Sequence, residues 1–261
     1  MDSLGVAVIV GLLIAASGFF GLLLQRWLAE HHTMERSRDM IGGVVGLLTL
    51  LLAVNLALLI WTAYGVYSTQ QTELQTLAAR ALEFDLETRQ YGPEADKGRE
   101  LLRRDLVWAH EQFWGDDTSR AAAYDASYKA MGDLNKFFDS LEPKTPAQTS
   151  LLAAARANYA FIGEQRLLMS MQAATPVVWP LVYAVTFWSC MMFAGMGLLS
   201  KLKPMASAML ILGAASIAIA IFLILEFNTP YTGFVRVPPG PLEEAIVVLD
   251  QPGPGETGGS Q

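Results

Sequence analysis

The 261-residue sequence is poor in charge and contains very little cysteine and histidine. Charged side chains make up 16% of it, against about 25% in soluble domains. The formal net charge of −7 provides no basic surface for phosphate groups, which excludes a nucleic-acid partner. A single cysteine, Cys190, rules out an intrachain disulfide and a thiolate metal cluster. The same shortages exclude an ordinary soluble enzyme and a disordered chain.

Catalytic and metal-binding patterns are also missing. His110 and Glu111 begin like the zinc-protease helix motif, but position 114 is Trp, so the second histidine ligand is absent. His31 and His32 are adjacent, and adjacent residues on a helix point about 100° apart, which favours solvated loop histidines over a metal site. We therefore predict that the protein is not an enzyme and uses no metal and no cofactor.

Long apolar runs without any ionisable residue are what the sequence has in abundance. Apolar side chains make up 52% of the chain, and four runs exceed the roughly 20 residues that a helix needs to cross the hydrocarbon of a bilayer. The predicted spans are Leu4–Leu24, Ile41–Trp61, a third beginning near Val177, and a fourth between Lys203 and Glu226. We interpret the first as an anchor rather than a signal peptide, because an acid precedes it and its apolar stretch is too long.

The loops within the first pair and within the second pair of spans are short, which predicts two hairpins, at residues 1–64 and 176–226. Between them, residues 65–175 hold 12 of the 18 Lys and Arg and 16 of the 25 Asp and Glu. Breaker and cap residues divide this insert into helices at 65–90, 94–114, 118–141 and 146–174, the last with a capping box at Thr145-Pro146-Ala147-Gln148. We predict an all-α integral membrane protein, with four transmembrane helices as two hairpins and an inserted antiparallel helical bundle.

Apolar periodicity supports this bundle. One face of its first helix is followed by Leu74, Leu77, Ala81, Phe84 and Leu86. Only the lone Gly65 interrupts the pattern between Trp61 and Gly92, so we expect span two to continue unbroken into the bundle. Residues 227–250 are predicted to be a surface segment, whose amphipathic stretch Pro241–Asp250 lies on the membrane or against the bundle. Residues 251–261 have a disordered composition.

The distribution of Lys and Arg near the span ends predicts the orientation. The hairpin loops carry Arg26, Arg36, Arg38, Lys201 and Lys203, whereas the opposite ends carry only Arg166 and Arg236. This excess places the hairpin loops in the cytoplasm and the helical bundle outside it.

Two polar residues of the spans invite an interpretation. Asn55 lies in the middle of span two, where an amide needs a partner; it either makes an interhelical hydrogen bond or lines a pore or a subunit interface. Glu226 is the only acid attached directly to an apolar span. It is either a helix-end carboxylate paired with a neighbour such as Arg236 or a functional acid.

Small residues recur at helical spacing within the spans, which lets helices approach closely in lipid. They are Ala7, Gly11 and Ala15, then Gly42 and Gly46, then Gly213, Ala214 and Ala218. Most are predicted to pack the monomer, and some could build an oligomer. Aromatic residues near the span ends are predicted to form interfacial belts: Trp27, Trp61, Tyr64, Tyr67 and Trp179.

An ordered set of residues in the last third of the chain carries a family resemblance. The set comprises Trp179, Pro180, Phe187, Trp188, Glu226, Pro230, Gly233 and Arg236, and earlier motifs are Gln71-Thr72-Glu73-Leu74 and Tyr91-Gly92-Pro93-Glu94-Ala95. The chain thereby resembles, over most of residues 5–246, the bestrophin-like family of unknown function, which is found mostly in bacteria. It departs from the family pattern at Asn228-Thr229 and Pro239-Gly240.

The resemblance implies a relation to bestrophins, which are oligomeric anion channels whose paired spans flank a helical domain on the cytosolic side. Two functions follow as expectations for a protein of the bacterial inner membrane. The first is an oligomeric anion channel with span two and Asn55 near its axis, whose partners are the lipid bilayer and further copies of the chain. The second is a non-conducting, membrane-anchored sensor or scaffold of the cell envelope, with a protein partner bound to residues 65–175.

Overall fold

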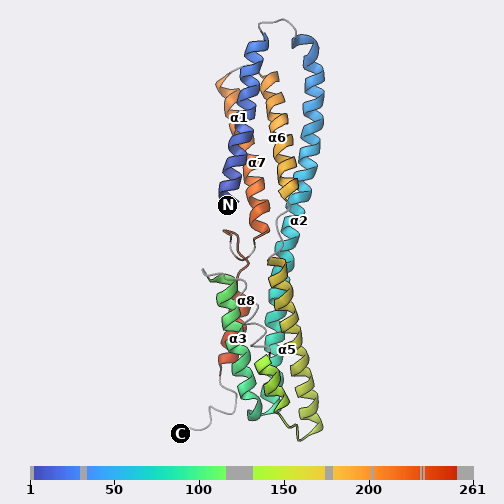
Figure 1. The fold of residues 1–261 in the computed structure, drawn as a ribbon, viewed down its shortest axis with the longest axis vertical. Helices are drawn as coiled ribbons and strands as arrows, with labels where there is room; N and C mark the ends of the chain where they lie inside the picture. Colours follow the sequence, from blue (N-terminus) through green and yellow to red (C-terminus); the bar gives the residue numbers. More distant parts are fainter. Residues whose placement is uncertain are drawn as a thin grey trace. The chain divides into compact units, whose positions relative to one another are not determined.

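The computed structural model describes residues 3–29, 34–115, 132–173, 179–200, 203–229, 231 and 233–251. Helices dominate this part of the chain, and no strand occurs within it (Figure 1). The elements are α1 (Ser3–Ala29), α2 (Met34–Tyr91), the 3-10 turn η1 (Pro93–Ala95), α3 (Asp96–Trp114), α5 (Pro146–Ala173), α6 (Trp179–Leu199), α7 (Pro204–Phe227) and α8 (Gly240–Asp250). Residues 132–139 are helical as well.

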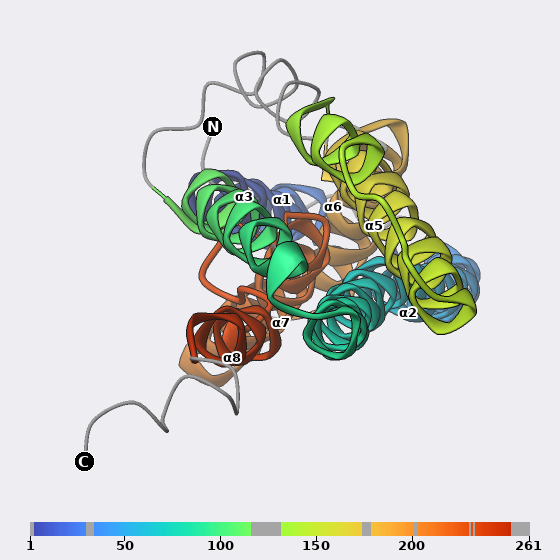
Figure 2. The ribbon, with the colours of Figure 1, turned by 90° about the horizontal axis from the view of Figure 1, so that it is seen from below.

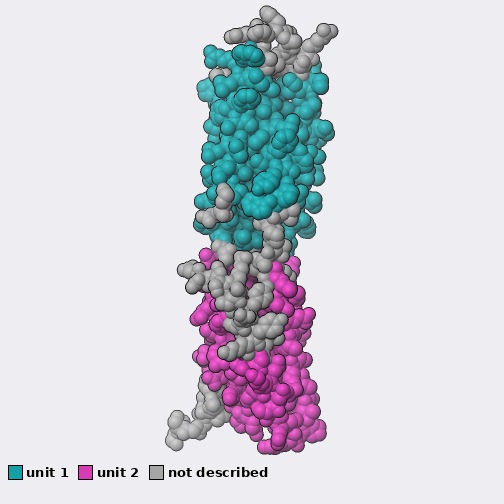
Figure 3. Space-filling model, viewed as in Figure 1, with its two compact units in different colours: residues 1–67, 176–229, 233–235 teal, residues 68–175, 230–232, 236–261 magenta. Residues whose placement is uncertain are grey.

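The chain forms two compact units (Figure 3). Unit 1 comprises residues 1–67, 176–229 and 233–235, and unit 2 comprises residues 68–175, 230–232 and 236–261. Helix α2 contributes its first part to unit 1 and its last part to unit 2, and it runs without a break from Met34 to Tyr91. The prediction of one continuous helix through Gly65 is therefore confirmed.

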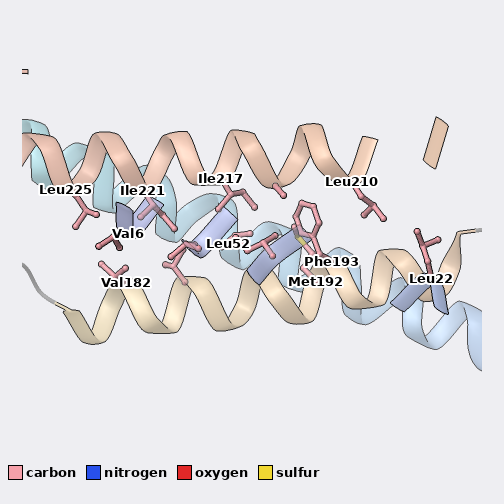
Figure 4. Close-up of a cluster of buried hydrophobic side chains, with 14 residues drawn as sticks. Val6, Leu22, Leu52, Val182, Met192, Phe193, Leu210, Ile217, Ile221 and Leu225 are labelled. Atoms are coloured by element: carbon pink, nitrogen blue, oxygen red, sulfur yellow. The ribbon is translucent and has the colours of Figure 1, made fainter. Parts of the chain in front are cut away.

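Unit 1 contains the membrane spans. Among the described residues, four helices are long and apolar enough to cross a bilayer, namely Ser3–Trp27, Asp39–Tyr91, Trp179–Leu199 and Pro204–Phe227. They correspond to the four predicted spans, which confirms the all-α membrane fold. Side chains from all four helices meet in one apolar core (Figure 4), which includes Ile14, Leu22, Leu52, Phe193 and Ile221.

Close packing in unit 1 depends on small residues of α1, which contacts both α6 and α7. A Cβ atom added to Gly21 would collide with the backbone of Ala194, and one added to Gly197 would collide with the backbone of Gly18. On the side of α7, a Cβ on Gly11 would lie 2.9 Å from the Cβ of Ala218. The predicted packing role of Gly11 is confirmed. Because no hydrophobic effect drives helices together in lipid, this backbone approach gives van der Waals contact in its place.

Unit 2 is a helical bundle around aromatic side chains. The rings of Phe84, Phe138 and Tyr159 lie with centroids 5.9 to 6.4 Å apart. Leu74, Leu77 and Ala81 share the buried face of α2, but the prediction for Leu86 is wrong, because its side chain is 56% exposed. A step of two residues from Phe84 turns the helix by about 200°. Thr88 occupies the buried position in its place.

The helix ends of unit 2 follow local capping signals. Gly92, with a φ of 124°, allows the sharp turn that ends α2 before Pro93. The predicted capping box begins α5: the N–H of Gln148 donates to Thr145 Oγ1 at 3.1 Å, and Gln148 Oε1 accepts from the N–H of Lys144 at 2.8 Å. Of the predicted helix 118–141, residues 118–131 lie outside the described part, and the structure is helical over 132–139, ending two residues before the predicted end.

The C-terminal helix α8 packs against α3 within unit 2 (Figure 2). Its buried residues are Leu242, Ala245 and Leu249. Of the two predicted locations for this amphipathic stretch, the structure therefore selects the bundle.

Candidate functional site

The first part of α2 is the least covered of the four spans. Only 6% of its most apolar window is buried within the chain, against 28 to 39% for the other three. Its inward face carries Leu52 in the core and Val45 against Gly195, and Thr49 Oγ1 donates to Met192 Sδ at 3.3 Å. The remaining faces of the helix form a continuous apolar surface, here called the open face of α2.

The open face has two flanks, one of small and one of large side chains. The 3.6-residue helical repeat decides which residues belong to each flank. One flank is built of small residues: Gly42, Gly46, Ala53 and Ala57. A Cβ atom at either of its two glycines would meet nothing within 4 Å. The other flank is bulky and exposed: Met40, Leu47, Leu51, Val54 and Leu58. Packing within the described chain thus does not require these glycines, unlike those of α1.

Asn55 lies half-buried at the edge of the open face, beside the inward stripe that contains Leu52. Its Nδ2 atom donates to the carbonyl of Leu51 at 2.7 Å, within the same helix. This bond is intrahelical and uses one of the two Nδ2 hydrogens, so an interhelical hydrogen bond from Asn55 stays a prediction. The pore-lining or subunit-interface role of Asn55 stays a prediction.

Glu226, at the end of α7, has a buried carboxylate with defined partners. Its side chain is 1% exposed, and Oε2 accepts hydrogen bonds from the backbone N–H groups of Phe234 and of Val235, the latter at 3.1 Å. Backbone donors thus bind the acid in place of water. Its pairing with Arg236, which is exposed, stays a prediction.

Gly233 fits the same loop for a steric reason. A Cβ atom there would collide with Glu226 Oε2 and lie 3.2 Å from Thr229 Oγ1. The structure therefore brings together Glu226 and Gly233 of the predicted set. Sequence reasoning missed Phe234 and Val235, because their contribution is backbone N–H groups, which leave no trace in residue identity.

Aromatic residues surround this loop on its exposed side. Phe234 is 79% exposed and lies 6.1 Å from Phe222 between ring centroids. Phe227 packs against Tyr64 and Tyr67 at 5.8 and 5.5 Å. This arrangement is typical of the interfacial end of a span, where rings lie at headgroup depth.

The other residues of the predicted family set do not converge on one site. Trp179 stacks on Tyr183 with centroids 6.1 Å apart, Pro180 and Phe187 are exposed, and Trp188 is half-buried along α6. Pro230 lies outside the described residues, as do His31 and His32. The set thus contains one local carboxylate site and several outward-facing positions.

Unit 2 contains a buried charge cluster that fastens α8. Asp85 accepts from Arg89 Nε and from Arg99 Nε, both at 2.6 Å. Nη2 of each arginine donates to the carbonyl of Gln251 at 3.0 Å, and further bonds reach Val248 and Leu249. The two guanidinium groups thereby cap the carbonyl end of α8, where positive charge is favourable. The i,i+4 spacing of Asp85 and Arg89 was a signal for their pair, but nothing local signals Arg99 or the carbonyls.

The other end of α8 and its preceding segment are tied to α3. Trp114 Nε1 donates to the carbonyl of Val237 at 2.9 Å, and His110 Nε2 lies 3.2 Å from Glu243 Oε1. The ring of His110 also stacks on Trp114, with centroids 5.5 Å apart. His110 therefore has a structural environment and not the surroundings of a zinc ligand. No group of three or more His, Cys, Asp or Glu residues that could hold a metal occurs among the residues the structure describes.

A second buried ion pair joins α3 to α5. Arg166 Nη1 donates to Asp105 Oδ2, and the guanidinium lies 5.8 Å from the ring of Trp108. Nearby, burial and then the charge of Asp105 raise the pKa of Tyr159 well above its usual value. The neutral phenol is thus the stable form in the bundle.

Glu87 is a partly buried acid on α2 that faces α5. Both of its carboxylate oxygens accept from Asn158 Nδ2 at 3.0 Å. Burial raises the pKa of Glu87 above its usual value, and the hydrogen bond from Asn158 opposes that shift.

Comparison with known proteins adds two findings. The model of the bestrophin-like domain family matches residues 11–242. The fold also matches the crystal structure of a point mutant of a bacterial bestrophin homologue from Klebsiella pneumoniae, with a TM-score of 0.68 and 13% sequence identity. That match covers 93% of this chain and 98% of the other, and at this identity it shows the fold alone. A comparison with curated proteins finds no match.

Proposed function

This chain belongs to the bestrophin-like domain family, as the residues of its last third indicated, and from that membership we propose that it is an oligomeric ion channel that passes anions. The proposal places it in the inner membrane of a bacterium. It also assigns the open face of α2 to contacts between copies and to the pore.

The open face of α2 is the observation that carries this proposal. Because only 6% of this span is buried within its own chain, most of its surface must contact either another protein surface or lipid. The small flank fits the bulky flank of a neighbouring copy, because glycines whose Cβ positions are empty allow close helix approach. Repeating one such heterologous contact around an axis closes a ring. The part of the open face between the flanks, with Leu50 and Trp61, would then face the axis.

Such a pore selects ions without a charged ring. Span two carries no ionisable residue between Asp39 and Glu73, so selectivity would come from a hydrophobic constriction and from backbone and amide dipoles. Asn55, at the edge of the open face, is placed to contribute an amide near the contact between copies.

Anion flux through liposomes tests the proposal. Proteoliposomes containing the purified chain should release chloride above the level of empty liposomes, and Ala57→Trp on the open face should lower that flux severalfold. Leu12→Trp is the matched control, because Leu12 is exposed on α1, away from the proposed axis. A monomer in native-like lipid, or flux equal to background under every condition, would exclude the channel.

The continuous helix α2 favours a second candidate function. A single helix from Met34 to Tyr91 joins a membrane span to a solvated bundle, as in a membrane-anchored sensor or scaffold. This alternative predicts a partner protein that co-purifies with the intact chain through residues 65–175. A chain that conducts and binds no such partner would exclude it.

A further inference from the structure

Two buried polar side chains of unit 2 have no hydrogen-bond partner among the residues that the structure describes. The amide of Gln70 on α2 is fully buried, and neither its Oε1 nor its Nε2 atom is bonded to any described residue. Tyr231, which follows α7, is 4% exposed, and its hydroxyl is likewise unpartnered over the described ranges. Buried polar groups are almost always hydrogen-bonded, so each of these needs an explanation.

The surroundings of the two groups place them at one end of unit 2. Glu73 lies three residues after Gln70, on the same side of α2. Burial, and then the charge of Glu73, raise the pKa of Tyr231, so the carboxylate lies near the phenol. The Tyr231 ring packs against Phe113 and Trp114 with centroids 5.0 and 5.3 Å away. Trp114 Nε1 already donates to the carbonyl of Val237, so it is not the partner of the Tyr231 hydroxyl.

The chemistry of these groups defines the ligand. A bound anion would need donors only, and a bound cation would need acceptors only. Gln70 offers two N–H donors and a carbonyl acceptor, and the Tyr231 hydroxyl can do both. A ligand that both donates and accepts is required, and it must be small because both side chains are buried.

We propose that Gln70 and Tyr231 bind shared, buried water that bridges α2 to the segment following α7. A buried water makes two to four hydrogen bonds, typically to polar groups that lack another partner. This hydration site is independent of ion conduction, so its test does not depend on the proposed channel. Its role within unit 2 is to hold Tyr231, which itself packs against the end of α3.

Two substitutions and their combination test the shared site by thermal unfolding of the full chain in lipid nanodiscs. Gln70→Met and Tyr231→Phe should each lower the unfolding midpoint by about 2–4 °C, because each removes a partner of the water. The double variant should lose less than the sum, since both act on one site. Tyr159→Phe is the control, at an equally buried tyrosine of the bundle, and it should add to Gln70→Met.

The opposite sign overturns the proposal. If no water is bound to these two groups, removing either one removes an unsatisfied polar atom. The unfolding midpoint then stays the same or rises. Additive losses would also overturn it, because the two groups would then not share water.

Hydroxyl-radical footprinting tests the unsubstituted chain directly. A brief X-ray pulse converts bound water into radicals that oxidise the side chains they touch. Tyr231 should be oxidised severalfold faster than Tyr159, although both are buried. Equal or slower oxidation of Tyr231 would overturn the proposal without relying on any variant.

Discussion

At the scale of single residues, the end of the last span is organised by one carboxylate and one missing side chain. Glu226 accepts from two backbone N–H groups, and Gly233 leaves the space that its Oε2 atom fills. The acid and the glycine both belong to the ordered set of residues that carries the family resemblance. Their relation was not, because it depends on a loop whose donors are main-chain atoms.

Gly233→Ala should destabilise the protein by about 1–3 kcal/mol, the usual effect of forcing an extra methyl group into a filled site. The added Cβ would displace the Glu226 carboxylate from the N–H groups of Phe234 and Val235. Thermal unfolding in detergent measures the effect. Gly240→Ala is the control, because a Cβ there meets nothing within 4 Å. Equal midpoints for the two variants would contradict the steric argument.

Glu87 makes the folding stability depend on pH, and the sign of this dependence follows from the surroundings of its carboxyl group. Its pKa in the folded chain is raised above 4.5, mainly by burial, so folding favours the protonated acid. The stability it contributes is therefore fully present below about pH 4.5 and is lost as the pH rises through the folded pKa. Glu87→Gln keeps the shape but cannot ionise. Its unfolding midpoint, relative to that of the parent chain, should rise between about pH 4 and pH 7. A difference that does not change with pH would be the contrary result.

At the scale of helices, local signals predicted most of the elements of unit 2. The capping box at Thr145 and the turn at Gly92 each depend on a few adjacent residues, and both are present in the structure as predicted. The face of α2 was misjudged at Leu86, because apolar character alone does not distinguish a step of two residues from a step of three or four. The capping of α8 by Arg89 and Arg99 was beyond local reasoning, since donors and carbonyls lie more than a hundred residues apart in sequence.

Gly21→Ala should disrupt the packing of α1 on α6. The methyl group would collide with the backbone of Ala194, which cannot move aside as a flexible side chain could. We expect a loss of about 2 kcal/mol or more and a smaller monodisperse fraction in size-exclusion chromatography. Gly5→Ala on the same helix is the control, because a Cβ there has open space around it. If both variants behave alike, the contact between α1 and α6 is not as close as described.

At the scale of the whole molecule, the number of spans was predictable because lipid tolerates so few charges. The long gaps between charged residues mark four helices, and the part of the chain that the structure describes has four helices able to span a bilayer. Which helices touch was not predictable, because an apolar surface in lipid carries no sign of facing lipid or protein. The glycines at Gly18, Gly21 and Gly197 decide it, and they resemble other span glycines until their neighbours are known.

The orientation proposed from the charge count can be checked by labelling in intact cells. In a background lacking Cys190, Lys144→Cys should react with a membrane-impermeant maleimide, because its side chain is 78% exposed on unit 2. Asp39→Cys, at the other end of α2, should react only after the membrane is opened. The reverse pattern would place the bundle in the cytoplasm, as in bestrophins.

The arginine clamp on α8 has a practical consequence for anyone shortening this protein. A chain cut after Val237 would still contain every span, yet Arg89 and Arg99 would face each other across Asp85 without the carbonyls of Val248, Leu249 and Gln251. Both guanidinium groups would then lose these acceptors and keep only carboxylate partners, Asp85 for both and Asp96 for Arg99. Trimming for crystallisation should accordingly spare residues up to 251, and any affinity tag belongs beyond that point.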